Sequence, residues 1–400
     1  MSDAIVTGSM AGIAKTSVPT REELLARAER LVPVLRERSD RCEKLRHCPE
    51  ETVADMKASG LLRICQPARF GGYEHGWDVL CEVSRVLARG DGSQAWVGNI
   101  YNDHTQLLGM FDLAAQEDVW GKDPDTRLSA AIDPVGVARP VAGGVTYSGK
   151  HRYSSGIDHV QWLLCGGHIH DEGKPPRRCF FLIPKSDATV IDDWHVIGLA
   201  GTGSKSFEIK DVFVPAHRIL DGDQSDEGAG PGTKFNKAAV FRMPRHDIAG
   251  TGFASIAVGI AEGLFDEYVK YTRTRSSRGM AVAEQMGTQI GVGHSAAELQ
   301  AASRLAIGSA REAMEVLGRG ERLGKQQRQQ TRLSSAFAAQ LTLAAVQRLF
   351  NAAGGRALFL DNVMQRQMRD VAAVAAHRSL AWDTSRAAYG ELTLGHGAAT

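Results

Sequence analysis

The sequence predicts an α+β protein with an N-terminal helical domain, a central antiparallel β-barrel or sandwich, and a C-terminal four-helix bundle. Three observations predict this order. Apolar residues follow a helical period over 20–126, short glycine-punctuated runs with alternating apolar residues occupy 127–220, and long helical runs fill 237–400. With 400 residues, the chain is long enough for two or three domains.

The first domain begins after a polar, glycine-rich stretch at 1–19, which we expect to be a flexible leader. Thr20 can cap a helix that carries Leu24, Leu31 and Leu35 on one face. Pro49 suits the first position of a second helix. Further helices are expected at 77–89, 93–110 and 114–120.

The β domain at 127–220 is predicted from strands such as the one in which Phe207 and Ile209 alternate with polar residues. Residues 221–236 are acidic and rich in glycine, which fits either a solvated flexible loop or a mobile lid. After them, helices are expected at 248–274, 295–317, 333–353 and 370–390, forming an up-down bundle.

The composition excludes several classes of function. Forty-seven Lys and Arg against 46 Asp and Glu leave a net charge of +1, without the basic excess that nucleic acid or an anionic membrane would require. No apolar run approaches the roughly 20 residues of a membrane span. The six cysteines form no C-x-x-C pair, so we expect buried, inert thiols and no metal site. Without a secretory signal, the expected location is the cytoplasm.

Known nucleotide and hydrolase motifs are missing from the sequence. It has no G-x-G-x-x-G after a strand, no Walker A motif, no G-x-S-x-G and no H-E-x-x-H. Two histidines remain as candidates for proton transfer, because only histidine titrates near neutral pH without perturbation. His377 follows an alanine-rich helical run and His104 follows Tyr-Asn-Asp on a helix, although each residue alone is more often a structural histidine.

Glycine-hydroxyl clusters are the second chemical resource. Ser154-Ser155-Gly156 and Gly201-Thr202-Gly203-Ser204 can present N–H groups and hydroxyls to a phosphate or a planar cofactor, or can be surface turns. Gly354-Gly355, at a helix end, is either a C-cap or an anion site completed by a neighbouring chain.

Taken together, these segments resemble the acyl-CoA dehydrogenase fold, and within it the two-component, reduced-flavin-dependent monooxygenases typified by p-hydroxyphenylacetate hydroxylase oxygenase components. The resemblance runs from about Pro49 to Gly395 and is most specific at 104–162, 198–218 and 368–383. Dehydrogenases of this fold carry a glutamate base in the last of these segments. Here it reads QRQMRDVAAVAAH, which resembles the arginine-aspartate pair and histidine of the oxygenases at Arg369, Asp370 and His377.

The resemblance implies a flavin site. Trp96 would lie against the flavin pocket, Ser154 and Ser155 would lie near flavin nitrogen 5 (N5), and Arg242 would face the ring, with Arg245 three residues later. The isoalloxazine or ribityl edge is expected to be held by Thr202, Gly203 and Ser204. The phosphate end is expected to be approached from an adjacent subunit by Gly354 and Gly355.

The resemblance also implies a substrate site. His377 would be the catalytic histidine, and His104 would meet the substrate's hydroxyl or ring nitrogen. Either histidine could remove the substrate proton, and Ser155 would be the third catalytic residue. The family usually has tryptophan in the G-x-W-x-x-S-S-G turn, and here His151 replaces it. Ala131 is expected to face the substrate pocket. There the phenol hydroxylases tend to carry a serine, and His151 is expected to contact the substrate as well. These two replacements leave a phenolic and an indole-type ring equally open.

The implied function is hydroxylation of a small aromatic substrate through a flavin hydroperoxide. The chain would use O2 and reduced flavin (FADH2 or FMNH2) from a separate NAD(P)H-flavin reductase, and would act as a homotetramer. Two alternatives stay open: an acyl-CoA dehydrogenase with tightly bound FAD and its base at Glu262 or Glu267, and a non-catalytic helical assembly protein.

Overall fold

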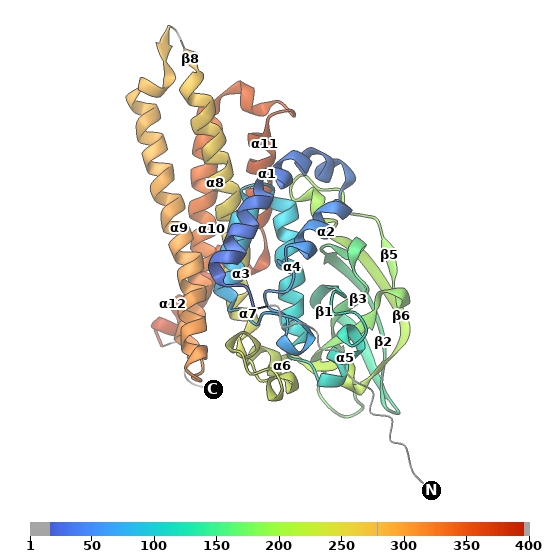
Figure 1. Ribbon diagram of the computed structural model, residues 1–400. Helices are drawn as coiled ribbons and strands as arrows, with labels where there is room; N and C mark the ends of the chain where they lie inside the picture. Colours follow the sequence, from blue (N-terminus) through green and yellow to red (C-terminus); the bar gives the residue numbers. More distant parts are fainter. Residues whose placement is uncertain (1–16, 278, 396–400) are drawn as a thin grey trace.

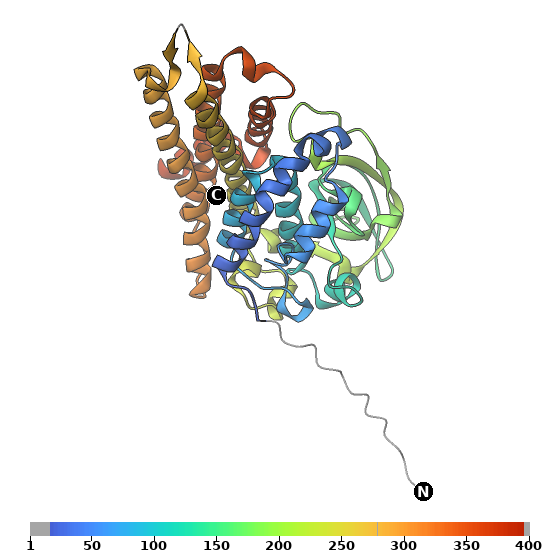
Figure 2. The ribbon, with the colours of Figure 1, turned by 45° about the horizontal axis from the view of Figure 1, so that its top comes forward.

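The molecule has three layers side by side, with the N-terminal helices lying between a helical bundle and a sheet (Figures 1 and 2). The computed structural model describes residues 17–277 and 279–395. Most of the predicted leader, 1–16, therefore lies outside the described residues. A continuous hydrophobic core joins the layers, with Leu80, Phe207 and Ile256 as members from the three of them.

Five helices make the middle layer, at the positions that the sequence predicts. They are α1 (Arg21–Leu45), α2 (Glu50–Ala58), α3 (Trp77–Ala88), α4 (Gly92–Leu108) and α5 (Leu113–Trp120). Thr20 begins α1 with a capping box, because its hydroxyl accepts from the Glu23 N–H and the Glu23 carboxylate accepts from its own N–H. Asp91 caps α4, and every residue of α4 is buried between the other two layers.

Seven strands form one mixed sheet in the order β5-β6-β2-β1-β3-β4-β7. They are β1 (Leu128–Val141), β2 (Gly144–Ser154), β3 (Trp162–Ile169), β4 (Arg177–Pro184), β5 (Thr189–Ile191), β6 (Lys205–Pro215) and β7 (Ile219–Asp221). The sequence predicts antiparallel strands, but β1 and β3 pair in parallel. Because β2 already occupies one edge of β1 as a hairpin, the chain crosses over and places β3 on the other edge.

The acidic segment 221–236 contains two short helices, α6 (Gly222–Asp226) and η6 (Pro231–Lys234). Asn236 fixes its end to the middle layer, since its side-chain amide donates to the Gly109 carbonyl at 2.8 Å and to the Gln116 side chain at 3.0 Å. The segment then leads through η7 (Ala239–Arg242) into the bundle.

The bundle consists of α8 (Gly250–Thr274), α9 (Met286–Gly318), α10 (Lys325–Ala353) and α11 (Val363–Ala375), preceded by α7 (Arg245–Ile248). Its outer end carries a short ribbon of β8 (Ser276–Ser277) and β9 (Met280–Ala281), at the top of Figure 1. The span Arg245–Thr274 is long and apolar enough to cross a membrane, contrary to the sequence estimate. Its apolar window is 89% buried in the protein, which is typical of a core helix.

The predicted helix at 370–390 is wrong, because the chain breaks between α11 and α12 (Trp382–Thr393). His377 lies in the break, where its ring Nδ1 accepts from the Ser379 N–H and caps the 3₁₀ turn η10 (Arg378–Leu380). Leu380 is fully buried in that turn, which packs against α8 and α10. Burial of Leu380 and the histidine cap override the high helix propensity of the alanine run.

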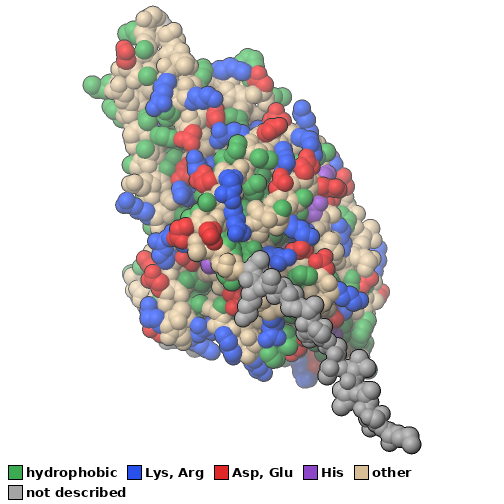
Figure 3. All heavy atoms as spheres, viewed as in Figure 1, with side chains coloured by type: hydrophobic (Ala, Val, Ile, Leu, Met, Phe, Trp, Pro, Cys, Tyr) green, Lys and Arg blue, Asp and Glu red, His purple; other side chains and the backbone are tan. Residues whose placement is uncertain are grey.

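Both signs of charge are interspersed over the face shown in Figure 3, as expected for a chain with a net charge of +1.

Candidate active site

A chain of four hydrogen bonds connects α4, the end of β2 and the loop before β6. The Trp96 indole N–H donates to the Ser155 hydroxyl at 3.0 Å, and the Ser155 and Ser204 oxygens lie 2.7 Å apart. Ser204 lies 2.7 Å from the Thr202 hydroxyl, which donates to the Leu199 carbonyl at 2.8 Å. Four predicted flavin-site residues are thus in direct contact, and we call this set the hydroxyl chain.

The loop that carries Thr202 and Ser204 is held by close contacts with three helices, α1, α4 and α11. Leu199 and Gly203 adopt left-handed φ angles of 53° and 55°, on either side of η4 (Ala200–Thr202). The Leu199 N–H donates to the buried Asp370 carboxyl on α11 at 2.6 Å. A Cβ at Gly201 would lie 2.2 Å from the Cys42 sulfur of α1, so the approach requires glycine.

Asp370 is an unusual anchor because burial, together with the nearby Asp91 carboxyl, raises its pKa to about 7. The sequence pattern singles out Asp370 only through its resemblance to the oxygenases. Asp370 lies on α11, seven residues before His377, and its contact with Leu199 joins that helix to the hydroxyl chain.

A pair of serine hydroxyls, those of Ser129 and Ser154, lies beside the hydroxyl chain. The Ser129 hydroxyl of β1 contacts the Ser154 hydroxyl at 2.7 Å and the Ser155 carbonyl at 2.7 Å. Ala131 lies two residues further along β1 and therefore shares the strand face of Ser129. Both residues are buried, so this face of β1 belongs to the same region as the predicted flavin residues.

Trp96 also connects the hydroxyl chain to His377. Its ring stacks on Phe253 of α8 at 4.6 Å between centroids, and both rings contact His377, at 5.6 Å for Trp96 and 4.4 Å for Phe253. Burial lowers the pKa of His377 to about 4, and the neighbouring Arg378 guanidinium lowers it too. His377 is therefore neutral at pH 7.

His104 is the second buried histidine of this region. Its Nδ1 lies 3.3 Å from the Leu128 carbonyl, which can only accept, so Nδ1 carries the proton and Nε2 has a free lone pair. Burial lowers its pKa to about 4, while the adjacent Asp103 carboxylate acts to raise it. Asp103 forms a buried bidentate ion pair with Arg245, whose Nε lies 2.7 Å from Oδ1.

His151 lies elsewhere, in the core of the sheet. Its Nε2 contacts the Tyr147 hydroxyl at 2.6 Å, and its ring stacks on Phe207 at 5.0 Å. Positions i and i+4 of β2 turn His151 to the face that carries Tyr147, and its contact with substrate stays a prediction. Gly354 and Gly355 end α10, where Arg275 donates to the Ala352 and Ala353 carbonyls.

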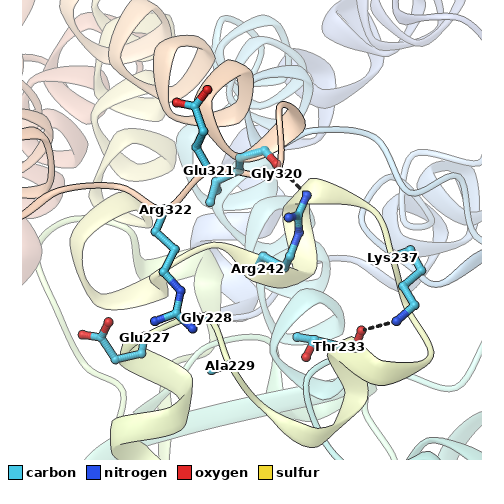
Figure 4. Close-up of a pocket in the computed structure, with 10 residues that line it drawn as sticks. Glu227, Gly228, Ala229, Thr233, Lys237, Arg242, Gly320, Glu321 and Arg322 are labelled. Atoms are coloured by element: carbon cyan, nitrogen blue, oxygen red, sulfur yellow. Dashed lines mark hydrogen bonds between the residues drawn. The ribbon is translucent and has the colours of Figure 1, made fainter.

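Arg242 does not join the histidines. It lines a pocket of about 460 Å³ between the 227–237 segment and the end of α9, and its guanidinium donates to the Leu317 carbonyl at 2.5 Å (Figure 4). Arg245 is the arginine beside His104 instead. Arg245 takes the place expected for Arg242 because the turn at Pro244, which begins α7, directs Arg245 to Asp103 on α4.

Comparisons with known proteins show the family to which this chain belongs. Residues 251–382 match the family model described as acyl-CoA dehydrogenase, C-terminal domain. The chain is 34% identical to the flavin-dependent monooxygenase oxygenase subunit HsaA of Mycobacterium tuberculosis, covering 90% of this chain and 93% of that protein. It belongs to the oxygenase subunits of flavin-dependent monooxygenases. This oxygenase is also 33% identical to the FADH2-dependent resorcinol hydroxylase, oxygenase component, of a Rhizobium species, over 93% and 94% of the two chains.

Solved structures agree with the fold of this oxygenase. The 3-HSA hydroxylase from Rhodococcus superposes with a TM-score of 0.89 at 32% identity, covering 93% of this chain and 97% of that one. XiaF from Streptomyces, in complex with FADH2 and glycerol, has a TM-score of 0.89 at 26% identity, covering 95% and 97%. The two glutamates considered as bases for the dehydrogenase alternative form ion pairs instead, Glu262 with Arg85 and Glu267 with Arg36.

Sequence reasoning missed the partners that act through the fold. Asp103, Arg245 and Phe253 are scattered over the sequence. The ion pair of Asp103 with Arg245 and the contact of Phe253 with His377 exist only once α4, α7 and α8 are packed. One signal was available, because an aspartate at a fully buried helical position next to His104 requires a cationic partner.

Proposed function

We propose that this oxygenase hydroxylates a small phenolic or indole-type ring, using O2 and reduced FAD or FMN from a separate NAD(P)H-flavin reductase. The relatives support this substrate class by name: besides the resorcinol hydroxylase, they include p-hydroxyphenylacetate 3-hydroxylase from Acinetobacter baumannii and indole-3-acetate monooxygenase from Pseudomonas putida. The observation that carries the proposal is Trp96, which contacts the hydroxyl chain with its indole N–H and His377 with its ring.

The residues present fit a flavin. Ser155, Ser204 and Thr202 offer buried, uncharged hydroxyls in one row, beside the Trp96 ring plane. Such a set suits the polar edge of an isoalloxazine ring, and we assign Ser154 and Ser155 to the side of N5, and Thr202, Gly203 and Ser204 to the ring edge. Bound reduced flavin supplies the electrons that activate O2. Trp96, Ser155 and His104 are each less than a tenth exposed, so their side chains exclude water from the reacting atoms.

On the substrate side, the two histidines have different roles. His104 donates from Nδ1 to the Leu128 carbonyl, which leaves Nε2 as the base that accepts the proton of a phenol or indole. Asp103 stabilises the imidazolium that results, because the carboxylate favours the charged form. His377 accepts the Ser379 N–H at Nδ1, so its neutral ring carries the proton on Nε2 and donates a hydrogen bond to the substrate oxygen.

The proposal extends to assembly and location. A homotetramer would bring Gly354 and Gly355 of one subunit to the phosphate end of a flavin on another. The exposed Leu358, Phe359 and Leu360, three to five residues after Gly355, support a subunit contact there. All six cysteines are free and buried, which supports a reducing, cytoplasmic location.

The test is an aerobic assay of the full chain with enzymatically or chemically reduced FMN or FAD and three candidate substrates: resorcinol, p-hydroxyphenylacetate and indole. We expect hydroxylated product from at least one of them. His104→Gln should lower the product formed per reduced flavin by about 10²-fold, which is the usual contribution of a general base. His170→Gln, at an exposed position just after β3, is the matched control.

Two results would contradict the proposal. Turnover with NADH and no reductase would exclude the two-component arrangement. Full product yield from His104→Gln would move the base to another residue, and His377→Gln in the same assay would show whether that residue is His377.

A further inference from the structure

The pocket that Arg242 lines is separate from the hydroxyl chain and the two histidines. It has a volume of about 460 Å³ and lies between the 227–237 segment and the end of α9 (Figure 4). None of the residues that line it belongs to the hydroxyl chain. Sites for small organic molecules have volumes of about 300–1,000 Å³, so this pocket is large enough for one. Its lining includes three cationic side chains, those of Lys237, Arg242 and Arg322.

The two acidic residues of the lining are already neutralised from outside the pocket. The Glu227 carboxylate accepts from both terminal nitrogens of Arg328, at 2.9 and 2.8 Å. The Glu321 carboxylate accepts from Nε and Nη2 of Arg319, at 2.8 and 3.2 Å. These hydrogen bonds lower the pKa of both carboxyls, so both are ionised and paired. Neither Arg328 nor Arg319 is among the residues that line the pocket.

The three cations of the lining, in contrast, keep donors that a ligand can use. Within residues 17–277 and 279–395, the exposed Arg322 side chain has no hydrogen-bond or ion-pair partner. Lys237 Nζ donates to the Thr233 carbonyl at 3.3 Å, which is a long contact. Arg242 donates from Nη2 to the Leu317 carbonyl, and its Nε has no partner among the same residues.

The end of α9 does not oppose an anion here, although the carbonyls at a helix C-terminus ordinarily do. The Leu317 carbonyl accepts from the Gly320 N–H at 3.0 Å as well as from Arg242. The Val316 carbonyl accepts from the Glu321 N–H at 3.3 Å. Because these carbonyls and both carboxylates have partners, the three cations determine the charge of the pocket.

The number and type of the cations indicate the ligand. A phosphate monoester carries a charge of about −1.5 to −2 at pH 7, which three cations match better than the single charge of a carboxylate. Guanidinium groups also fit phosphate oxygens with two parallel hydrogen bonds. We propose that this pocket binds a small phosphorylated organic molecule, with Lys237, Arg242 and Arg322 as the groups that hold its phosphate. The volume leaves room for an organic body of the size of a sugar beside the phosphate. This site goes beyond the proposed function and does not depend on it.

The first test is isothermal titration calorimetry of the full, flavin-free chain with inorganic phosphate and glucose 6-phosphate. Glucose and acetate are the control ligands, one without charge and one with a single charge. We expect both phosphates to bind, glucose not to bind, and acetate to bind at least about 10-fold more weakly than phosphate. The affinity for phosphate should fall as the salt concentration rises, since the contacts are between charges near the surface.

Three variants test the cations. Arg322→Gln and Lys237→Gln each remove one charge at an exposed position and should weaken the binding of glucose 6-phosphate by about 10-fold. Arg322→Glu should abolish it, because it places a carboxylate against the phosphate. Arg304→Gln is the matched control, since this exposed arginine lies on α9 and is not part of the lining. The dissociation constants of reduced FMN and FAD should change by less than about 2-fold in all four proteins.

Several results would overturn the inference. They are the absence of phosphate binding by the natural protein, unchanged affinity in Arg322→Gln and Lys237→Gln, and an equal loss in Arg304→Gln, which would show attraction by net charge alone. Binding of inorganic phosphate without glucose 6-phosphate would refute the organic body of the ligand. A parallel loss of flavin binding in the variants would assign the pocket to the phosphate end of the flavin and refute a separate site. None of these results decides whether the protein hydroxylates an aromatic ring, which the product assay tests.

Discussion

One buried histidine, His151, should make the protein sensitive to acid by an amount that the structure defines. The Tyr147 hydroxyl donates to the Gly166 carbonyl at 3.0 Å, so it accepts the Nε2 proton of His151 at 2.6 Å. Protonation must then occur at Nδ1, which is buried without a hydrogen-bond partner among the described residues. Burial accordingly lowers the pKa of His151 from 6.5 to about 4.

The sign and size of the effect follow from linkage. Below pH 6.5 the unfolded chain binds a proton at this residue and the folded protein does not, so stability is full above pH 6.5 and is lost as the pH falls toward 4. The 1.5 pH units between 6.5 and 5 correspond to about 2 kcal/mol.

The test is urea unfolding of the natural protein and of His151→Leu at pH 7.5 and pH 5, at one protein concentration. His151→Leu loses a hydrogen bond and ring stacking at both values of pH, so this cost cancels in the difference. We expect the loss of stability on acidification to be about 2 kcal/mol smaller in His151→Leu than in the natural protein, and unchanged in the exposed control His170→Gln. An equal loss in all three proteins would refute the assignment of a neutral, buried His151.

Three further predictions concern the groups around the site. Arg245→Met should destabilise the protein by about 3–5 kcal/mol in urea unfolding, since it leaves the Asp103 carboxylate buried without its partner, and adding Asp103→Leu should restore most of the loss. Asp370→Asn keeps an acceptor for Leu199 but cannot ionise. Because the pKa of Asp370 is raised to about 7, the stability of the natural protein falls between pH 5 and pH 7, and the variant should gain about 2 kcal/mol relative to it over this range. Equal slopes of stability against pH in the two proteins would contradict this. Arg242→Ala should lower stability by about 1 kcal/mol, through the lost bond to Leu317, and change flavin affinity by less than about 2-fold; a loss of flavin binding would return Arg242 to the flavin site.

The helices of the first domain could be predicted because their signals are local. A capping threonine, a proline and a regular apolar face define α1 and α2 without knowledge of their neighbours. The parallel pairing of β1 with β3 could not be predicted in this way. The edge of β1 with which β3 pairs depends on where β2 already lies, and the sequence of β3 alone does not specify that edge.

The resemblance predicts which residues form the flavin site, but it does not predict how they are connected. Trp96, Ser155, Thr202 and Ser204 are identified from the resemblance, and the structure brings all four into contact. Their order, and the anchoring of Leu199, depend on distances that no spacing in the sequence encodes. Arg242 and Arg245 illustrate the same limit, because a turn at Pro244 decides which of the two arginines reaches Asp103.

The helix break at His377 has a physical reason that the alanine-rich sequence does not indicate. Had the helix continued, its backbone N–H groups would have been used within the helix, and the Nδ1 of His377 would have had no backbone N–H from which to accept. The break instead gives Nδ1 a partner in Ser379 and brings the ring to 4.4 Å from Phe253, beside Trp96. Local propensity is thus overridden at the place where the two halves of the site meet, which is where conflicts between sequence preference and structure are expected in enzymes. A variant that restores a continuous helix here should therefore retain the fold of the bundle and lose hydroxylation.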